Sequence, residues 1–181
     1  MEQFQNALNQ LLKQGAKGLV FDVREDGGGL VAALEKIVDP LLPAGDIATA
    51  TYQDGTTKVL VHSDANELNL PMMVLVNGNT ASAAELFTAS LKDFGKAEVI
   101  GEQTFGKGIM QNTFELPDGG AVTLTVATYQ TTKGECYHGV GITPDVIMEE
   151  DYEKVDFDHP NPEQDAQLKQ AMELLQSKIS S

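Results

Sequence analysis

The chain has 181 residues, which is enough for one well-cored domain and cramped for two. Its 27 acidic and 12 basic residues give a formal net charge of −15, which argues against binding nucleic acid or anionic membranes, because proteins that bind these carry basic patches. The single cysteine excludes an internal disulfide, and no apolar run reaches the roughly 18 residues of a membrane span.

Hydrophobic spacing over the first 38 residues predicts alternating helices and strands. Residues 2–14 have the spacing of an amphipathic helix, and residues 18–23 form an apolar run typical of a buried parallel strand. Three glycines at 27–29 then predict a loop, and residues 30–38 a second helix. This succession indicates an α/β layered fold with a mostly parallel central sheet.

The middle of the chain continues the pattern. Residues 47–52 and 57–61 predict two strands around an Asp-Gly turn, a common hairpin signal. Residues 71–76 form an apolar run that ends at a turn, and residues 81–91 are rich in good helix formers. A strand therefore leads directly into a helix at this point.

The last third predicts a hairpin and a terminal helix. Short strands are expected at 97–100 and 145–148, and Thr- and Val-rich segments at 112–116 and 121–130 flank a turn and predict a β-hairpin. The remaining segments are an acidic connector at 149–158 and a helix at 165–179.

Two side chains in this framework carry candidate chemistry. Ser82 lies where the predicted strand turns into a helix, and Lys107 lies between two glycines. A hydroxyl at a helix start and a lysine with room for close approach are the parts of a Ser–Lys pair, in which a neutral amine removes the serine proton. Taken alone, Ser82 with Glu85 also fits a helix capping box, and Lys107 fits a solvated loop lysine.

Three further groups fit the same chemistry. Gln111 follows Lys107 by an even number of residues, so that in a strand it shares the face of Lys107 and its amide can hold the amine. The backbone N–H of Ala83 is the natural donor for a developing oxyanion, and a second donor is expected from Gly28 or Gly29.

Four segments of the chain resemble the C-terminal processing peptidases, also called tail-specific proteases. The matches follow the order of that family from about residue 14 to residue 148. The segments are residues 22–29 (DVREDGGG), 77–85 (NGNTASAAE), 101–111 (GEQTFGKGIMQ) and 139–145 (GVGITPD).

The resemblance implies a crotonase-like (Clp-protease-like) core with a mostly parallel sheet plus a β-hairpin. It implies a serine endopeptidase that acts near unstructured C-termini of protein substrates through Ser82, Lys107 and Gln111, with Gly28 and Ala83 as the oxyanion hole. Residues 1–150 are then the protease catalytic core, and residues 151–181 an acidic connector and a C-terminal helix. The resemblance also implies that full-length relatives carry a PDZ module and further N-terminal segments, and that the protein acts at an extracytoplasmic place in the cell envelope or periplasm.

The sequence departs from the usual family pattern at several loop positions. Asp26 stands where asparagine is common, and Thr80 where serine is common. Glu135 and Cys136 occupy positions that are often basic and hydroxylic. These changes leave the proposed catalytic groups in place but affect the expected loop geometry and local charge.

Other chemistries have weaker support in the sequence. No pattern makes His62, His138 or His159 a base, and the lone Cys136 has no matched base. No metal-ligand spacing is present, so we expect neither a metal nor a cofactor. Two alternatives stay open: an inactive peptide-binding remnant of the same fold, and an acyl-CoA enzyme of crotonase type, which leaves the Lys–Gln segment unexplained.

Overall fold

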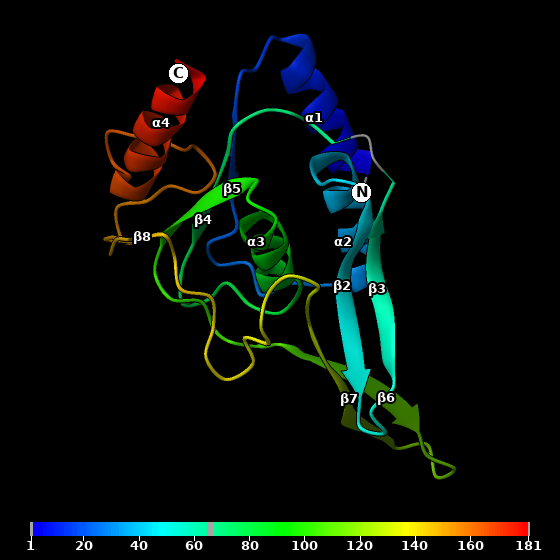
Figure 1. Ribbon diagram of the computed structural model, residues 1–181. Coiled ribbons are helices and arrows are strands. Elements are labelled where there is room, and N and C mark those ends of the chain that lie inside the picture. Colours follow the sequence, from blue (N-terminus) through cyan, green and yellow to red (C-terminus); the bar gives the residue numbers. More distant parts are fainter. Residues whose placement is uncertain (1, 65–66, 181) are drawn as a thin grey trace.

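The computed structural model describes residues 2–64 and 67–180, and its elements stack in layers (Figure 1). The helices are α1 (Glu2–Lys13), α2 (Val31–Val38), α3 (Ala83–Asp93) and α4 (Ala166–Ile179), with a 3₁₀ turn η1 (Asp39–Leu41) after α2. The strands are β1 (Leu19–Asp22), β2 (Gly45–Tyr52), β3 (Thr57–Ser63), β4 (Met72–Val76), β5 (Ala97–Gly101), β6 (Ile109–Glu115), β7 (Ala121–Thr131) and β8 (Val146–Ile147).

A parallel sheet with the order β1-β4-β5-β8 forms the centre of the molecule. All five residues of β4 are buried, as expected for a strand covered on both faces. Alternate side chains of β4 point to opposite faces: Met72 and Val76 enter the main core, whereas Met73 and Leu75 enter a second, smaller core. The predicted α/β fold with a parallel sheet is confirmed.

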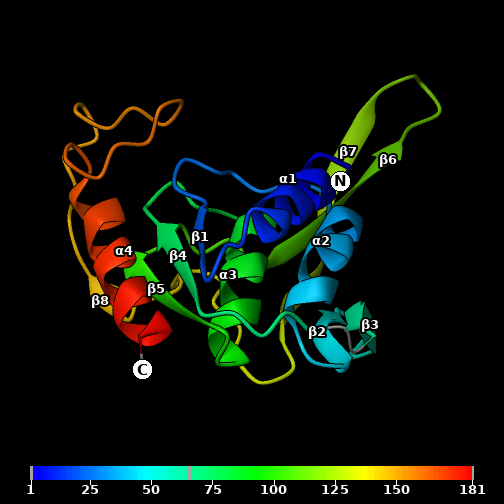
Figure 2. The same ribbon diagram turned by 90° about the horizontal axis from the view of Figure 1, so that it is seen from above.

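The two faces of this sheet are covered by different helices (Figure 2). On one face, α3 lies between the parallel sheet and the remaining strands, with Leu86 and Phe87 in the main core. On the other face, α4 packs Ala171 and Leu175 against β4 and β5. A Cβ at Gly18 would lie 2.8 Å from Leu175, so the absence of a side chain there lets the helix approach β1.

The remaining strands form an antiparallel sheet with the order β3-β2-β7-β6. The two predicted hairpins, β2–β3 and β6–β7, are joined by pairing of β2 with β7. The sequence does not signal this joining, because the paired residues, such as Ala48 and Thr131, lie far apart in the chain. The tip of the β6–β7 hairpin extends away from the rest of the molecule (Figures 1 and 2).

One boundary differs from the predicted one in a way that affects the site. Strand β6 begins at Ile109 rather than at residue 112, because Ile109 and Met110 already pair with Thr128 and Ala127 of β7. Gln111 is therefore a strand residue. None of the described helices combines the length and the apolar character needed to cross a membrane.

Candidate functional site

Ser82 lies at the turn between β4 and α3, immediately before the first residue of the helix. Its backbone has φ 58° and ψ −119°, a conformation that residues other than glycine rarely adopt. Among the described residues other than glycine, only Ser82 and Glu25 have a positive φ. Strained backbone of this kind persists where the surrounding structure holds it, and it concentrates at functional sites.

The Ser82 hydroxyl contacts a tyrosine. Its Oγ lies 3.2 Å from the hydroxyl oxygen of Tyr129 on β7, and that hydroxyl donates to the carbonyl of Lys107 at 2.8 Å. A tyrosine has one hydroxyl proton, so Ser82 is the donor in the contact between the two. Burial raises the pKa of Tyr129, which keeps the hydroxyl protonated.

Glu85, on the first turn of α3, is completely buried and joins the serine to the lysine segment. One carboxylate oxygen accepts from the Ser82 N–H at 2.9 Å and from the Lys107 N–H at 2.7 Å. The other accepts from the Gly106 N–H at 2.7 Å and from the Thr104 hydroxyl at 2.6 Å. Glu85 therefore does more than cap the helix, the role that the local sequence suggests.

The glycine loop lies against the start of α3. A Cβ at Gly28 would lie 2.5 Å from the Ala81 carbonyl oxygen and 2.6 Å from the Ala83 nitrogen, so a side chain at this position would collide with the backbone. The φ of Gly28 is 89°, which also favours glycine. The Gly28 N–H donates to Asp26 Oδ1 at 2.8 Å, and the Ala81 N–H donates to the Asp26 carbonyl at 2.9 Å.

The structure brings Ser82, Ala83 and Gly28 together but does not pair the side chains of Lys107 and Gln111 with them. Lys107 is half-buried in the segment between β5 and β6, and Gln111 is exposed on β6. Within residues 2–64 and 67–180, neither the Lys107 ammonium nor the Gln111 amide has a hydrogen-bond partner. The backbone of Lys107 is nevertheless fixed next to the serine by Glu85 and Tyr129.

A cavity of about 410 Å³ opens beside the serine, with Gly28 and Ala83 on its wall. Its lining is mostly apolar and comes from β1, α2, α3 and the glycine loop, with Leu30 exposed at the rim. Apolar cavities with a few converging polar groups are the usual form of a ligand site.

The other candidate groups lie outside this arrangement. The His138 ring contacts the Gly106 carbonyl at 3.2 Å, and His62 and His159 are exposed next to aspartates. Cys136 is half-buried. No group of three or more His, Cys, Asp or Glu side chains in the described parts of the chain is arranged to hold a metal ion.

Sequence reasoning missed Tyr129 as a partner of the serine. Tyr129 lies in a segment that reads as an ordinary Thr- and Val-rich strand, and only the packing of β7 against α3 brings its hydroxyl to Ser82. The ring of the neighbouring buried Tyr137 packs edge-on against the Tyr129 ring, with the ring centroids 6.1 Å apart.

Fold and site together define a layered α/β protein organised around one serine, which lies at a strained strand-to-helix turn beside backbone N–H groups. The chain belongs to peptidase family S41, whose model matches residues 1–148.

The relatives within this family are C-terminal processing proteases. The chain is 37% identical over 94% of its length to the carboxyl-terminal-processing protease of Synechocystis sp., and it spans 39% of that protein. It is 40% identical over 80% of its length to the chloroplastic C-terminal processing peptidase of Tetradesmus obliquus, and it spans 32% of that protein.

Solved structures of proteases also match this chain. The structure of a photosystem II D1 C-terminal processing protease matches 80% of this chain and 38% of its own, at 39% identity and a TM-score of 0.74. The tricorn protease structure matches 91% of this chain at 26% identity and a TM-score of 0.55. The chain thus spans well under half the length of these relatives.

Proposed function

We propose that this chain is the catalytic core of a serine endopeptidase that cleaves near the C-terminus of protein substrates. Membership of family S41 and the names of the relatives support a serine-type peptidase. The strained Ser82, the adjacent N–H groups and the apolar cavity support the assignment of this serine as the nucleophile.

In the proposed mechanism, Ser82 Oγ attacks the scissile carbonyl while Lys107 takes the hydroxyl proton. The resulting ammonium then donates this proton to the leaving amine, and an acyl-enzyme forms that water hydrolyses. Gln111 holds the lysine amine without neutralising it by charge. This mechanism requires the Lys107 side chain to reach Ser82 in place of the Tyr129 hydroxyl, which contacts the serine in the structure.

The N–H groups of Ala83 and Gly28 are the proposed donors to the oxyanion of the tetrahedral intermediate. The close approach of the Gly28 backbone to the Ala83 nitrogen supports this pairing. The Gly28 N–H already donates to Asp26, so the oxyanion shares or displaces that acceptor.

The observation that carries the proposal is the bridge made by Glu85. One buried carboxylate accepts from the N–H groups of both Ser82 and Lys107, so the backbones of the two proposed partners are fixed to the same side chain.

The proposal extends to the substrate and to the full-length protein. The cavity beside Gly28 accepts an apolar side chain next to the scissile bond, within a substrate whose C-terminus is unstructured. A PDZ module elsewhere in the full-length protein presents that terminus, in an extracytoplasmic part of the cell envelope or periplasm. We also assign the layered core to the crotonase-like arrangement.

Labelling of Ser82 tests the proposal without requiring the remainder of the protein. A fluorophosphonate probe is added to the wild type, to Ser82→Ala and to Ser177→Ala, which removes an exposed serine on α4. We expect one adduct on Ser82 in the wild type and in Ser177→Ala, and none in Ser82→Ala. A wild type that remains unlabelled, or an adduct that persists in Ser82→Ala, contradicts the proposal and favours a peptide-binding remnant.

A further inference from the structure

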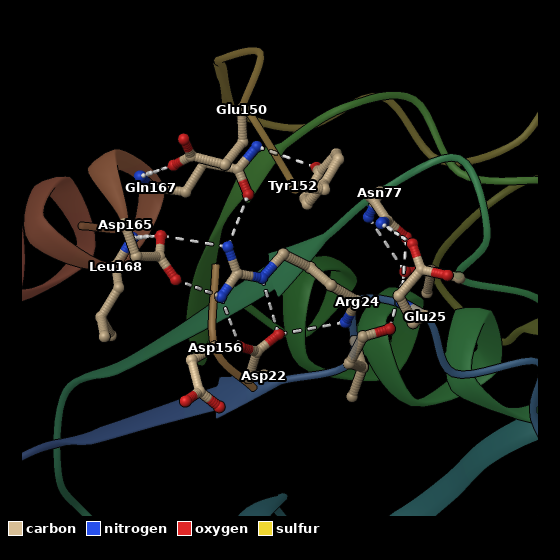
Figure 3. Close-up of polar contacts among 12 residues, drawn as sticks. Asp22, Arg24, Glu25, Asn77, Glu150, Tyr152, Asp156, Asp165, Gln167 and Leu168 are labelled. Atoms are coloured by element: carbon tan, nitrogen blue, oxygen red, sulfur yellow. Dashed lines mark hydrogen bonds and ion pairs between the residues drawn. The ribbon is translucent and has the colours of Figure 1, made fainter. Parts of the chain in front are cut away.

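Arg24 lies buried between the end of β1 and the C-terminal segment, with 5% of its surface exposed (Figure 3). Its Nε and Nη2 donate to the two carboxylate oxygens of Asp22 at 2.9 and 2.6 Å. Nη1 and Nη2 donate to the two oxygens of Asp165 at 3.1 and 2.6 Å, and Nη1 also donates to Gln167 at 3.2 Å. All five guanidinium donors are therefore used.

The partners of Arg24 on the far side belong to the last part of the chain. Asp165 is the N-cap of α4, where its Oδ1 also accepts from the Leu168 N–H at 2.8 Å. Gln167 is fully buried. Its side-chain amide donates to the Met148 carbonyl at 2.6 Å, and its backbone N–H donates to the Glu150 carboxylate at 2.9 Å. Asp165 and Gln167 lie beyond residues 1–148, the part of the chain that the family model matches.

The residues after Arg24 form the loop that lies against the catalytic serine. Glu25 has φ 59°, and its N–H donates to Asn77 Oδ1 at 3.1 Å (Figure 3). The Glu25 carboxylate accepts from Asn77 at 2.6 Å and from Asn79 at 2.8 Å. The strained loop is thus fixed from one side by the turn before Ser82 and from the other by the anchored side chain of Arg24.

Burial by itself lowers the pKa of Arg24, but hydrogen bonds and charge from Asp22 and Asp165 outweigh it and keep the pKa above its ordinary value. The guanidinium is therefore permanently charged. A buried charge that loses one of its carboxylate partners is strongly destabilised and moves towards water. Because Glu25 is the next residue along the chain, such a movement changes the loop that positions Gly28.

We propose that Asp165 is a positioning residue of the active site: by completing the partners of Arg24, it holds the strained loop from Glu25 to Gly28 against Ala83. The C-terminal segment then contributes to catalysis by fixing this loop through Arg24. This inference rests on the proposed function for its effect on catalysis, whereas its effect on the loop does not depend on that function.

The test compares Asp165→Asn with Asp156→Asn. Asparagine caps a helix as well as aspartate does, so Asp165→Asn removes the charge and keeps the cap. Asp156 is exposed in the neighbouring acidic connector, and within the described residues its side chain is hydrogen-bonded to Asp158 and His159, so Asp156→Asn is a matched control that removes a surface charge. Two quantities are measured: the acylation of Ser82 by a p-nitrophenyl ester over a range of probe concentrations, followed by the release of p-nitrophenolate, and amide hydrogen exchange across residues 24–29.

We expect Asp165→Asn to lower the maximal acylation rate about 10-fold, with little change in the probe concentration at half-maximal rate, because the donors are displaced rather than lost. Exchange at Asp26 and Gly28 should be faster, while exchange in β7 stays unchanged. Asp156→Asn should match the wild type in both measurements.

Wild-type exchange across residues 24–29 in a folded Asp165→Asn protein overturns the inference. So does an acylation rate equal to that of the wild type. If Asp165→Asn does not fold, Asp165→Ser also removes the carboxylate and keeps a helix cap, and wild-type behaviour of this variant in both readouts likewise overturns the inference. A wild type that is not acylated at all contradicts the proposed function, and the exchange readout then still decides on the loop.

Discussion

Asp26 places a negative charge beside one of the proposed oxyanion donors. Its Oδ1 accepts from the Gly28 N–H at 2.8 Å, closing a short turn in the glycine loop. An asparagine side chain can form the same turn, because its carbonyl oxygen is also an acceptor. The aspartate carboxylate differs from this amide in its negative charge, which repels the developing oxyanion.

Asp26→Asn should therefore raise kcat/KM, or the rate of acylation by a neutral probe, by about 3-fold at low salt, a modest gain because the side chain is exposed. The gain should shrink in 1 M salt, where charges are screened within about 3 Å. Asp118→Asn is the control, because Asp118 forms the same turn with the Gly120 N–H in the distant β6–β7 loop. A lower rate in Asp26→Asn would show that the charge assists the site.

The residues of the site differ in how far sequence could predict them. Ser82, Ala83 and the glycine loop belong to local strand–turn–helix patterns, and the structure brings them together. The contact of Ser82 with Tyr129 depends on packing between segments 47 residues apart, which no local pattern reports. The roles of Lys107 and Gln111 remain predictions.

At the scale of single elements, the first turn of α3 connects the serine to the segment that carries Lys107. Glu85 accepts from three backbone N–H groups and one hydroxyl, and all four donors lie in the turn before α3 and in the segment between β5 and β6. A glutamine has the same shape but replaces one acceptor oxygen with an NH₂ group, which cannot accept from these donors.

Glu85→Gln should therefore lower the free energy of unfolding by about 3 kcal/mol, because buried donors lose their acceptor. It should also slow acylation of Ser82 at least 10-fold at a temperature where the variant is folded, since the Lys107 segment is no longer fixed to α3. Denaturant unfolding and labelling rates measure the two effects, with the exposed Glu173→Gln on α4 as the control. A Glu85→Gln protein with unchanged labelling would show that the bridge has no catalytic role.

Most helices and strands could be predicted from the sequence because their signals are local. The amphipathic spacing of α1 and the fully apolar β4 are examples, and both lie close to the predicted ranges. The start of β6 could not be predicted, because Ile109 and Met110 become strand residues only by pairing with β7. The same holds for the joining of the hairpins, which depends on contacts between Ala48 and Thr131.

At the scale of the whole molecule, one buried charge cluster helps to bind the C-terminal segment to the core. Burial of Asp165 opposes its ionisation, but hydrogen bonds from Arg24 and the Leu168 N–H outweigh this and lower the pKa of Asp165 below its usual value. The carboxylate therefore contributes stability that is present above the unfolded pKa of about 3.9 and is lost as the pH falls through the lower folded pKa.

The wild type should accordingly melt at a higher temperature than Asp165→Asn at pH 6, and the difference should decrease below about pH 4 as the wild-type carboxyl group takes up a proton. Thermal melts of both proteins between pH 2.5 and pH 7 measure this difference, and the comparison cancels the general effect of acid on a chain with a net charge of −15. A difference in melting temperature that does not change with pH would contradict the assigned ion pair.

The Ser–Lys pair is the central claim, and the acylation rate of Ser82 in Lys107 variants tests it most directly. Lys107→Ala lacks the base, and Lys107→Arg keeps the charge but cannot release its proton. Each should lower the rate by about 10³-fold or more without unfolding the protein. His138→Gln, which replaces the imidazole that contacts the Gly106 carbonyl, should leave the rate nearly unchanged. The account is contradicted if Lys107→Arg is acylated at the wild-type rate while His138→Gln is not acylated.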